Sequence, residues 1–234
     1  MSRNESRARC SRSIDLDSAS VSKLEHLSER YREHNRIHRG HNFVWGGAQR
    51  IEPLRRAVGG PGLRVLDLGC RDGALTRFYA SQNDVVGLDV DREALAEAAR
   101  LGIETVWADV EEPLPFDEGS FDVVVTAELL EHVREPEAVV AEAVRVLRPG
   151  GTLAGSVPHA HRLKNRFRFL IGRPIDENPM HLHMFSPSDV RALLAELEVA
   201  RLELVVGRFV TLRPGWFANV IVFSARKAVD GRSQ

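Results

Sequence analysis

Short apolar segments alternate with helical patterns between residues 61 and 157. Consecutive apolar positions predict five strands, at 65–68, 85–88, 105–108, 121–127 and 152–157. The stretches between them carry apolar residues at helical spacing, at 74–82, 92–101 and 136–147, the last ended by Pro149-Gly150-Gly151. Strands that are apolar on both faces and separated by helices are typical of a parallel sheet covered on both sides. We therefore predict an α/β fold.

The last third of the chain has a different pattern. Ser186, followed by Pro187, predicts the start of a helix that runs to about residue 197. Two apolar segments, 201–206 and 217–224, then read as closing strands that could run antiparallel, which brings the expected sheet to seven strands. Residues 158–186 form a long connection, and such a connection inside a compact domain is usually a functional lid or holds extra helices.

The start of the chain divides into a tail and a helical segment. Residues 1–20 are rich in Ser and Arg without periodicity, which indicates a disordered tail. Residues 21–60 are expected to form an N-terminal helical cover that ends at a glycine-rich breaker. The main domain is then predicted over 61–226, with its lid at 158–186, and 227–234 as a flexible C-terminus.

The overall charge is close to zero. The chain has 32 Lys+Arg and 33 Asp+Glu, so bulk charge argues against a nucleic-acid binder. Two cysteines, Cys10 and Cys70, do not suggest a disulfide framework, and we find neither an apolar run of transmembrane length nor a secretory signal. These features predict a cytoplasmic protein without a membrane partner.

The segment Val65-Leu-Asp-Leu-Gly-Cys-Arg-Asp-Gly73 is the most informative part of the sequence. A predicted buried strand runs into Gly69 and turns through Gly73 into a helix, and such a turn exposes backbone N–H groups to a ligand. Asp89 ends the next strand, where an acidic residue of nucleotide-binding α/β folds accepts hydrogen bonds from ribose. The pattern suggests a nucleoside at the carboxyl edge of the sheet.

The spacing of the turn argues against a dinucleotide. A pyrophosphate site normally has three glycines as G-x-G-x-x-G, whereas Arg71 stands between Gly69 and Gly73 here. Asp67 and Asp72 would also repel a pyrophosphate. They suit a ligand with a cationic end, and S-adenosylmethionine has one in its sulfonium and amino groups.

This segment resembles motif I of the class I S-adenosylmethionine-dependent methyltransferases, of the small-molecule type that includes the methyltransferase-11 and -23 groups. Their usual D/E-x-G-x-G-x-G corresponds to Asp67-x-Gly69-x-Arg71-x-Gly73. Later segments also match in order, namely Gly87–Asp89, Ala108–Val110 with 114–122, Glu128–Val133 and Val146–Gly151, and more weakly 181–187. The resemblance implies a Rossmann-like, seven-stranded, mostly parallel sheet with helices on both faces and a lid after strand five.

The resemblance also implies roles for individual residues. Asp89 would bind the ribose, Asp109 would accept from the adenine amino group, and Glu128 would lie beside the cofactor. The full set of expected cofactor-binding residues is Asp67, Gly69, Cys70, Arg71, Gly73, Asp89, Val90, Asp109, Val110 and Glu128. Arg71 departs from the pattern, because a positive φ there would cost a residue with a side chain about 1 kcal/mol.

Histidines supply the candidate catalytic groups. His132 and His159 follow strands four and five, so either could take a proton from an acceptor, although His132 could equally be a packing residue. Two His-x-His pairs, 159/161 and 181/183, would place their rings on one face of a strand, which is compatible with a metal site. We favour a turn of the lid for the second pair and expect no metal.

Basic residues gather in the predicted lid. Arg166, Arg168 and three neighbours form this cluster, which is either a solvated face or a site for a phosphate or carboxylate. We expect a small anionic acceptor, phosphorylated or nucleotide-like, bound by Arg166, Arg168, His181 and Trp45. Trp45 has the alternative role of packing on the sheet edge.

The sequence thus predicts a methyltransferase that uses S-adenosylmethionine on a small molecule. Alignment and exclusion of water would be its main contributions to an in-line methyl transfer. Two alternatives remain open: a non-enzymatic cofactor-binding scaffold or sensor, and an enzyme that uses the same fold for other chemistry. A nicotinamide dehydrogenase is less favoured, because the third turn glycine is absent.

Overall fold

The computed structural model describes residues 18–38, 44, 46–175 and 178–229. Trp45 and most of the predicted N-terminal tail lie outside the described residues, as does most of the C-terminal segment.

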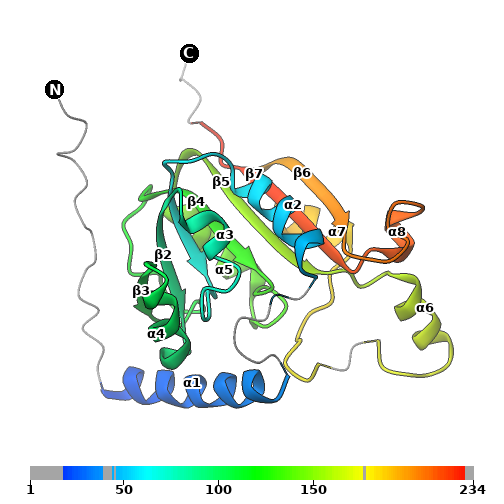
Figure 1. Ribbon diagram of the computed structural model, residues 1–234, viewed down its shortest axis with the longest axis horizontal. Helices are drawn as coiled ribbons and strands as arrows, with labels where there is room; N and C mark the ends of the chain where they lie inside the picture. Colours follow the sequence, from blue (N-terminus) through cyan, green and yellow to red (C-terminus); the bar gives the residue numbers. More distant parts are fainter. Residues whose placement is uncertain (1–17, 39–43, 45, 176–177, 230–234) are drawn as a thin grey trace.

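A single seven-stranded sheet forms the centre of the described fold (Figure 1). Its order is β3-β2-β1-β4-β5-β7-β6. The strands are β1 Arg64–Leu68, β2 Asp84–Asp89, β3 Glu104–Trp107, β4 Phe121–Ala127, β5 Leu147–Pro158, β6 Glu198–Val205 and β7 Val220–Arg226. The first five are parallel, and β7 pairs antiparallel with both β5 and β6. The predicted Rossmann-like fold is confirmed, including its two antiparallel closing strands.

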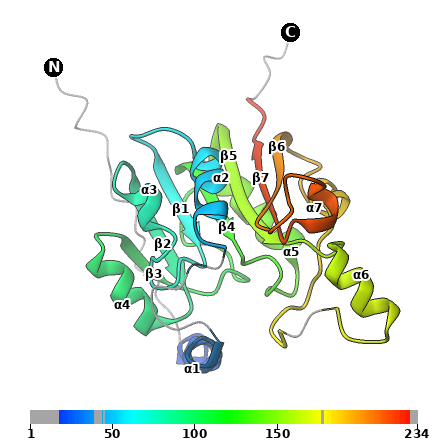
Figure 2. The same ribbon diagram turned by 45° about the vertical axis from the view of Figure 1, so that its right-hand side comes forward.

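Helices cover both faces of the sheet (Figure 2). On one face lie α2 Ala48–Val58, α3 Arg77–Ala80 and α4 Arg92–Arg100, and on the other lie α5 Pro136–Val146 and α7 Pro187–Leu193. Each face encloses its own apolar cluster, which explains why the central strands are apolar on both sides. Ser186 caps α7 as predicted, in a reciprocal capping box with Asp189.

Two predicted boundaries were wrong. The helix expected over 74–82 is reduced to α3, Arg77–Ala80, because the residues before it complete the glycine turn, where Asp72 Oδ1 accepts from Ala74 N. Pro149-Gly150-Gly151 lies inside β5 and does not separate helix from strand. The sheet continues through it because Gly150 N donates to Lys227 O (3.1 Å) and Lys227 N donates to Gly151 O (2.8 Å).

Helix α1, Ser18–His38, lies across the sheet at the ends of the parallel strands (Figure 1). Polar contacts hold it there: Lys23 pairs with Asp109 (3.2 Å) and with Glu112, Arg32 pairs with Glu93, and Ser28 Oγ accepts from Arg92 N (3.3 Å). Leu24 adds a buried apolar contact. The helix predicted in this region is therefore present, and it is docked on the edge where a ligand was expected.

The lid segment leaves the sheet and returns to it. Its helix α6, Leu163–Leu170, packs near α8, Pro214–Phe217, and lies away from α1 (Figure 2). The chain then comes back as an extended segment, 180–183, against the loop that follows β4. Over the residues that the structure describes, none of the helices combines the length and apolar character needed to cross a bilayer.

Candidate active site

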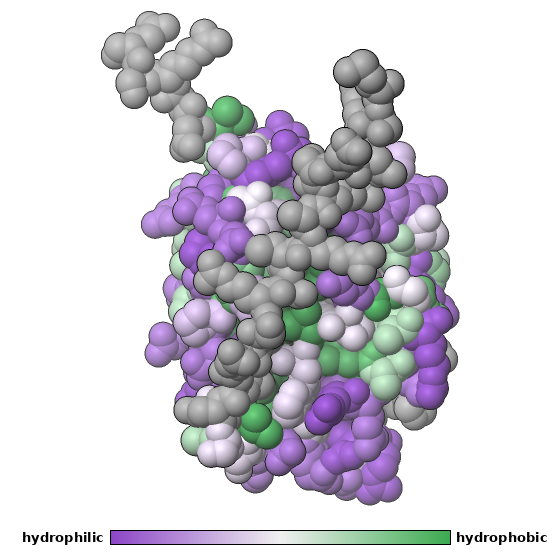
Figure 3. Space-filling view, turned by 90° about the vertical axis from the view of Figure 1, so that its left-hand side faces the viewer, coloured by the Kyte–Doolittle hydropathy of each residue, from purple (hydrophilic) through white to green (hydrophobic). Residues whose placement is uncertain are grey.

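A pocket opens at the carboxyl edge of the parallel strands, under α1. Its walls come from α1, the turn after β1, the end of β2 and the loops after β3 and β4. From α1 come Leu27 and Tyr31, and burial raises the pKa of the Tyr31 hydroxyl. Hydrophilic residues dominate the rim of the face in Figure 3, with hydrophobic residues nearer its middle. Because Leu27 and Tyr31 lie on the pocket wall, helix α1 closes one side of the pocket.

The glycine turn is as tight as the sequence predicts. Gly69, Arg71 and Gly73 have φ values of 74°, 51° and 73°. A Cβ at Gly73 would approach Ile103 Cδ1 to 2.8 Å, and a Cβ at Gly69 would lie 3.1 Å from Leu129 Cδ1. Glycine is therefore favoured at both positions, where a side chain would meet both a left-handed φ and a close neighbour.

Arg71 holds the left-handed conformation expected from its position. Its backbone N donates to Asp89 Oδ2 at 2.8 Å, so the strained residue ties the turn to the end of β2. Its side chain reaches towards Asp72, with 4.0 Å between Nη2 and Oδ2.

Replacing Arg71 with glycine relieves this strain. We expect Arg71→Gly to raise the free energy of unfolding by up to about 1 kcal/mol, because a left-handed φ disfavours any residue with a Cβ. Denaturant titration measures this change. Affinity for S-adenosylhomocysteine, measured in parallel, should be retained, and a loss of both affinity and turnover would show that the Arg71 side chain contacts a ligand.

Asp89 is the acidic residue best placed for a ribose. Its two carboxylate oxygens accept from Arg71 N and from Asp91 N, each at 2.8 Å, and the residue lines the pocket. Burial raises the pKa of Asp89 to about 6. Trp107 Nε1 donates to Val90 O at 2.9 Å and so fixes the next residue of the pocket wall.

The raised pKa of Asp89 predicts a pH-dependent affinity. A carboxyl group with a pKa near 6 is ionised at pH 7.5 and largely protonated at pH 5.5, and only the ionised form accepts on all its lone pairs. Affinity for S-adenosylhomocysteine should therefore fall by up to roughly fourfold as the pH drops from 7.5 to 5.5. Calorimetric titration at both pH values measures it. The dependence should disappear in Asp89→Asn, and an equal dependence in that variant would assign the effect to another group.

Three of the expected cofactor residues lie behind the turn and not on the pocket wall. Asp67 is 3% exposed, and its Oδ2 accepts from Thr76 Oγ1 and Tyr79 Oη, both at 2.6 Å. Burial raises the pKa of Asp67 to about 6. Cys70 is also buried, and Gly73 packs on Ile103. These residues shape the turn, and direct contact with a cofactor stays a prediction for them.

The loop after β3 forms another wall of the pocket. Asp109 Oδ1 accepts from Glu111 N at 3.0 Å, and Asp109 Oδ2 lies 3.2 Å from Lys23 Nζ of α1. Val110 lies beside it on the wall. Asp109 thus supplies a hydrogen-bond acceptor and Val110 an apolar surface, which are the two features that the predicted adenine side requires.

Glu128 lies on the wall after β4, as predicted, in a strained conformation. Its φ is 55°, its Oε1 accepts from Ser156 Oγ (3.1 Å), and its Oε2 lies 3.5 Å from Arg50 Nη1. Arg50, on α2, is only 5% exposed. Sequence reasoning missed Arg50; the available signal was an arginine at helical spacing from the apolar Leu54 and Val58.

The candidate histidines take different positions. His132 is on the pocket wall, and its Nδ1 lies 3.0 Å from Met180 O. His181 packs against it, with 4.7 Å between ring centroids. His159 is 2% exposed beside Ala218 O (3.1 Å), and burial lowers its pKa. The structure therefore brings His132 and His181 together, whereas His159 lies away from the pocket wall and its catalytic role stays a prediction.

The two arginines predicted to bind the substrate donate hydrogen bonds to backbone carbonyl groups of the lid. Arg166 Nε donates to His161 O (2.8 Å) and Arg168 Nε donates to Pro174 O (2.6 Å). On α6, Arg166 is exposed and Arg168 is half-buried, and neither is on the pocket wall. Their contact with an acceptor stays a prediction.

Comparison with known proteins agrees with this geometry. Residues 66–155, which run from within β1 to most of β5 and contain most of the pocket, match the family model described as "Methyltransferase domain". Residues 66–155 thus match a methyltransferase domain, and the sheet around them has the fold of the class I S-adenosylmethionine-dependent methyltransferases. The chain is also 39% identical over 115 residues to a ubiquinone biosynthesis O-methyltransferase from Cronobacter sakazakii, which covers 44% of this chain and 47% of that protein. The chain spans about half to three fifths of the length of the curated relatives it matches first.

Solved methyltransferase structures share the fold. One, an S-adenosylmethionine-dependent methyltransferase from Mesorhizobium loti, gives a TM-score of 0.59 at 23% identity and covers 75% of this chain and 96% of that one. Another is the 1,6-didemethyltoxoflavin-N1-methyltransferase from Burkholderia thailandensis, which holds its substrate and S-adenosylhomocysteine; it gives a TM-score of 0.62 at 20% identity and covers 91% and 92%. At these identities the likeness shows the fold alone.

The residues of the methyltransferase domain fit the family's methyl donor, S-adenosylmethionine. The open backbone at Gly69, the carboxylate of Asp89 and the apolar surface of Val90 and Val110 line one pocket. A nucleoside with a cationic end needs an acceptor for its ribose, an apolar wall for its base and acidic surroundings for its charge. All three are present.

Proposed function

We propose that this protein is an enzyme that transfers a methyl group from S-adenosylmethionine to a small molecule. One observation carries the proposal: a single pocket joins the ribose-binding carboxylate, Asp89, to Glu128 and His132 after β4. The first supports cofactor binding, and the other two supply polar groups for a second ligand. A cofactor-binding scaffold alone would not require this second set of groups.

Different residues of the pocket have different roles in the proposed reaction. S-adenosylmethionine, when bound, supplies a sulfonium methyl group that an acceptor can displace. Asp89 accepts hydrogen bonds from the ribose, and Val90 and Val110 contact the base. Leu27 and Tyr31 of α1 exclude water from the pocket, which favours a reaction between groups that are well solvated outside.

His132 is suited to hold a proton from the acceptor. The Met180 carbonyl oxygen can only accept, so the neutral imidazole carries its hydrogen on Nδ1 and leaves a lone pair on Nε2. That lone pair can take the proton of an acceptor hydroxyl or amine. The ring is fixed in this orientation by the segment that returns from the lid.

The experiment for this proposal is a transfer assay. The protein is incubated with methyl-deuterated S-adenosylmethionine and a panel of small hydroxyl, amino and carboxyl compounds, and products are identified by mass. Transfer of the labelled methyl group to a panel member, lost in Asp89→Ala, would support the enzyme. Tight cofactor binding without transfer to any compound in a broad panel would favour the scaffold.

We further propose that the acceptor is anionic. The support is the cluster of basic residues on α6, in the same lid whose returning segment, 180–183, docks beside His132. Arginine side chains recognise phosphate and carboxylate groups through paired N–H donors.

A double substitution tests the anionic acceptor. Arg166→Ala combined with Arg168→Ala should raise the acceptor KM several-fold and leave cofactor affinity unchanged, because the two ligands contact different walls. The difference in KM between the wild type and the variant should become smaller in high salt, because dissolved ions screen exposed charges, with a screening length of about 10 Å at 0.1 M. The control, Arg100→Ala with Arg201→Ala, removes two exposed arginines elsewhere and should leave the KM as it is. An unaltered acceptor KM in the lid variant would show that Arg166 and Arg168 are surface residues that do not bind the acceptor.

A further inference from the structure

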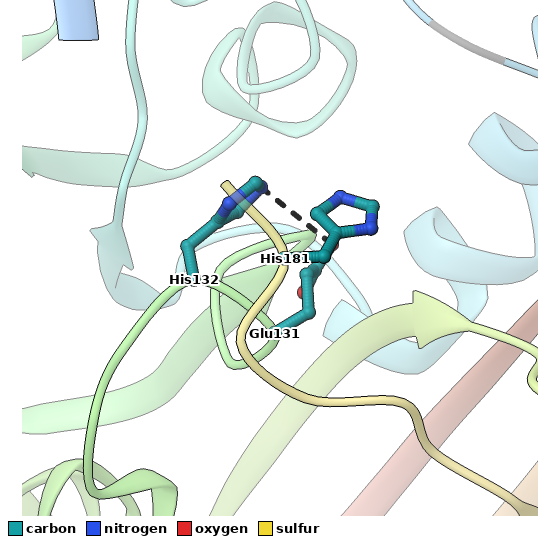
Figure 4. Close-up of side chains that lie close together, drawn as sticks. All are labelled: Glu131, His132 and His181. Atoms are coloured by element: carbon teal, nitrogen blue, oxygen red, sulfur yellow. Dashed lines mark ion pairs between the residues drawn. The ribbon is translucent and has the colours of Figure 1, made fainter. Parts of the chain in front are cut away.

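Glu131, His132 and His181 bring three ligand atoms together beside the pocket (Figure 4). One carboxylate oxygen and two ring nitrogens lie within 4.8 Å of one another. Two of these residues are adjacent after β4, and the third comes from the segment that returns from the lid. The cluster is different from both His-x-His pairs of the sequence. It contains His181 of the second pair but not His183, and its other members, Glu131 and His132, lie far from His181 in the chain.

Glu131 places a carboxylate in the interior. Its side chain is 0% exposed, and its Oε1 lies 3.9 Å from His132 Nε2. A bound cation balances the charge of a buried carboxylate that has little contact with water. A buried glutamate facing two histidines is therefore an arrangement that a metal ion would stabilise.

His132 has the orientation of a metal ligand. Its Nδ1 hydrogen bonds to Met180 O at 3.0 Å, which leaves the Nε2 lone pair turned towards Glu131. Histidine ligands in metalloproteins commonly donate their second ring N–H to a backbone carbonyl in this way, and the bond fixes both tautomer and ring angle.

The backbone fixes the position of His181. Leu182 N and His183 N both donate to Glu131 O, at 2.7 and 3.2 Å, and His183 Nε2 lies 3.2 Å from Arg134 O. These contacts on both sides hold the returning segment against the loop after β4. As a result the His181 ring packs edge-on against His132, with 4.7 Å between centroids.

We propose that Glu131, His132 and His181 bind a divalent transition-metal ion such as Zn²⁺, Mn²⁺ or Co²⁺. One carboxylate and two imidazoles are a ligand set that these ions accept. Ligand atoms at about 2.1 Å from one ion lie about 3–3.5 Å apart, so the three side chains need to close by about 1 Å. Three protein ligands leave coordination positions open, and one of the three, His132, lines the pocket.

The role of the ion rests on the proposed function. With the ion bound, His132 Nε2 would be a ligand, and the proton-accepting role proposed for it above would apply only to the metal-free protein. An acceptor with two neighbouring oxygen donors would be held at the open positions, and the ion would make its hydroxyl acidic enough to lose the proton to solvent. The resulting oxygen forms the new O–CH₃ bond while the S–CH₃ bond breaks, and the sulfur keeps the bonding electron pair. The site thus selects oxygen acceptors and holds them by charge.

Binding of Co²⁺ alone tests the site without any methyl acceptor. The full chain is freed of metal with a chelator and titrated with Co²⁺, with visible absorption as the readout, and Zn²⁺ is then added as a competitor. We expect one equivalent to bind the wild type and the affinity to fall at least tenfold in His181→Ala. His181 is partly exposed, so this variant should fold, which circular dichroism checks.

The control is His161→Ala, which removes an exposed lid histidine outside the cluster and should bind Co²⁺ as the wild type does. Equal Co²⁺ affinity in the wild type and His181→Ala, or no binding to the wild type, would overturn the metal site. S-adenosylhomocysteine affinity is measured on the same metal-free samples. It reports on the proposed function separately, because it should be the same in the wild type and His181→Ala whether or not metal binds.

Discussion

Replacing Asp89 with alanine is expected to weaken the binding of S-adenosylhomocysteine by about 10- to 150-fold, which corresponds to about 1.5–3 kcal/mol for hydrogen bonds to a charged group. Asp89 lines the pocket at the end of β2, and a carboxylate that already accepts from the backbone can also accept from ribose hydroxyls. Titration calorimetry at pH 7.5 measures the change.

Asp84→Ala is the matched control for this substitution. Asp84 starts the same strand at the opposite edge of the sheet, so its loss should leave the affinity unchanged. Because Asp89 also accepts from Arg71 N, thermal unfolding of both variants is recorded, and Asp89→Asn, of nearly equal shape, repeats the measurement. Wild-type affinity in folded Asp89→Ala and Asp89→Asn would remove the ribose assignment.

Replacing Arg50 with alanine is expected to lower the free energy of unfolding by roughly 2–4 kcal/mol. Arg50 is buried on α2 and lies 3.5 Å from Glu128, whose own side chain is 12% exposed. Removing the guanidinium leaves that carboxylate in a poorly solvated position and opens a space under α2. Equilibrium unfolding in urea measures the loss.

Arg55→Ala on the same helix serves as the comparison. Arg55 forms an exposed ion pair with Glu52, and such pairs contribute between nothing and about 1 kcal/mol. The double variant Arg50→Ala with Glu128→Gln should recover part of the stability, because it also removes the uncompensated charge. A single Arg50 variant as stable as Arg55→Ala would mean that Glu128 is compensated in another way.

The sheet could be predicted from the sequence because its signals are local. Strand β4, Phe121–Ala127, begins and ends where its apolar run does, and the glycine turn marks the end of β1. The helix at 74–82 was overestimated because residues up to Thr76 serve the turn, where Thr76 donates to Asp67. Apolar periodicity does not report such a side-chain bond.

The sequence predicted those residues of the candidate site whose place follows from a local motif. It did not predict contacts between residues from segments far apart in the chain. Asp89 and the positive φ of Arg71 follow from strand order and turn geometry. The pairing of Arg50 with Glu128, and of Glu131 with His181, depends on how α2 and the returning lid segment pack on the loop after β4. Such contacts between segments far apart in the chain have no signature in sequence spacing.

Direct titration of the wild-type protein with two nucleoside ligands tests the central claim. The pocket with one carboxylate at the ribose position and no third turn glycine should bind S-adenosylhomocysteine at a single site, and an excess of NAD⁺ should not displace it. Calorimetry with and without NAD⁺ gives both results in one series. Absence of any binding of S-adenosylhomocysteine, or its displacement by NAD⁺, would contradict the account.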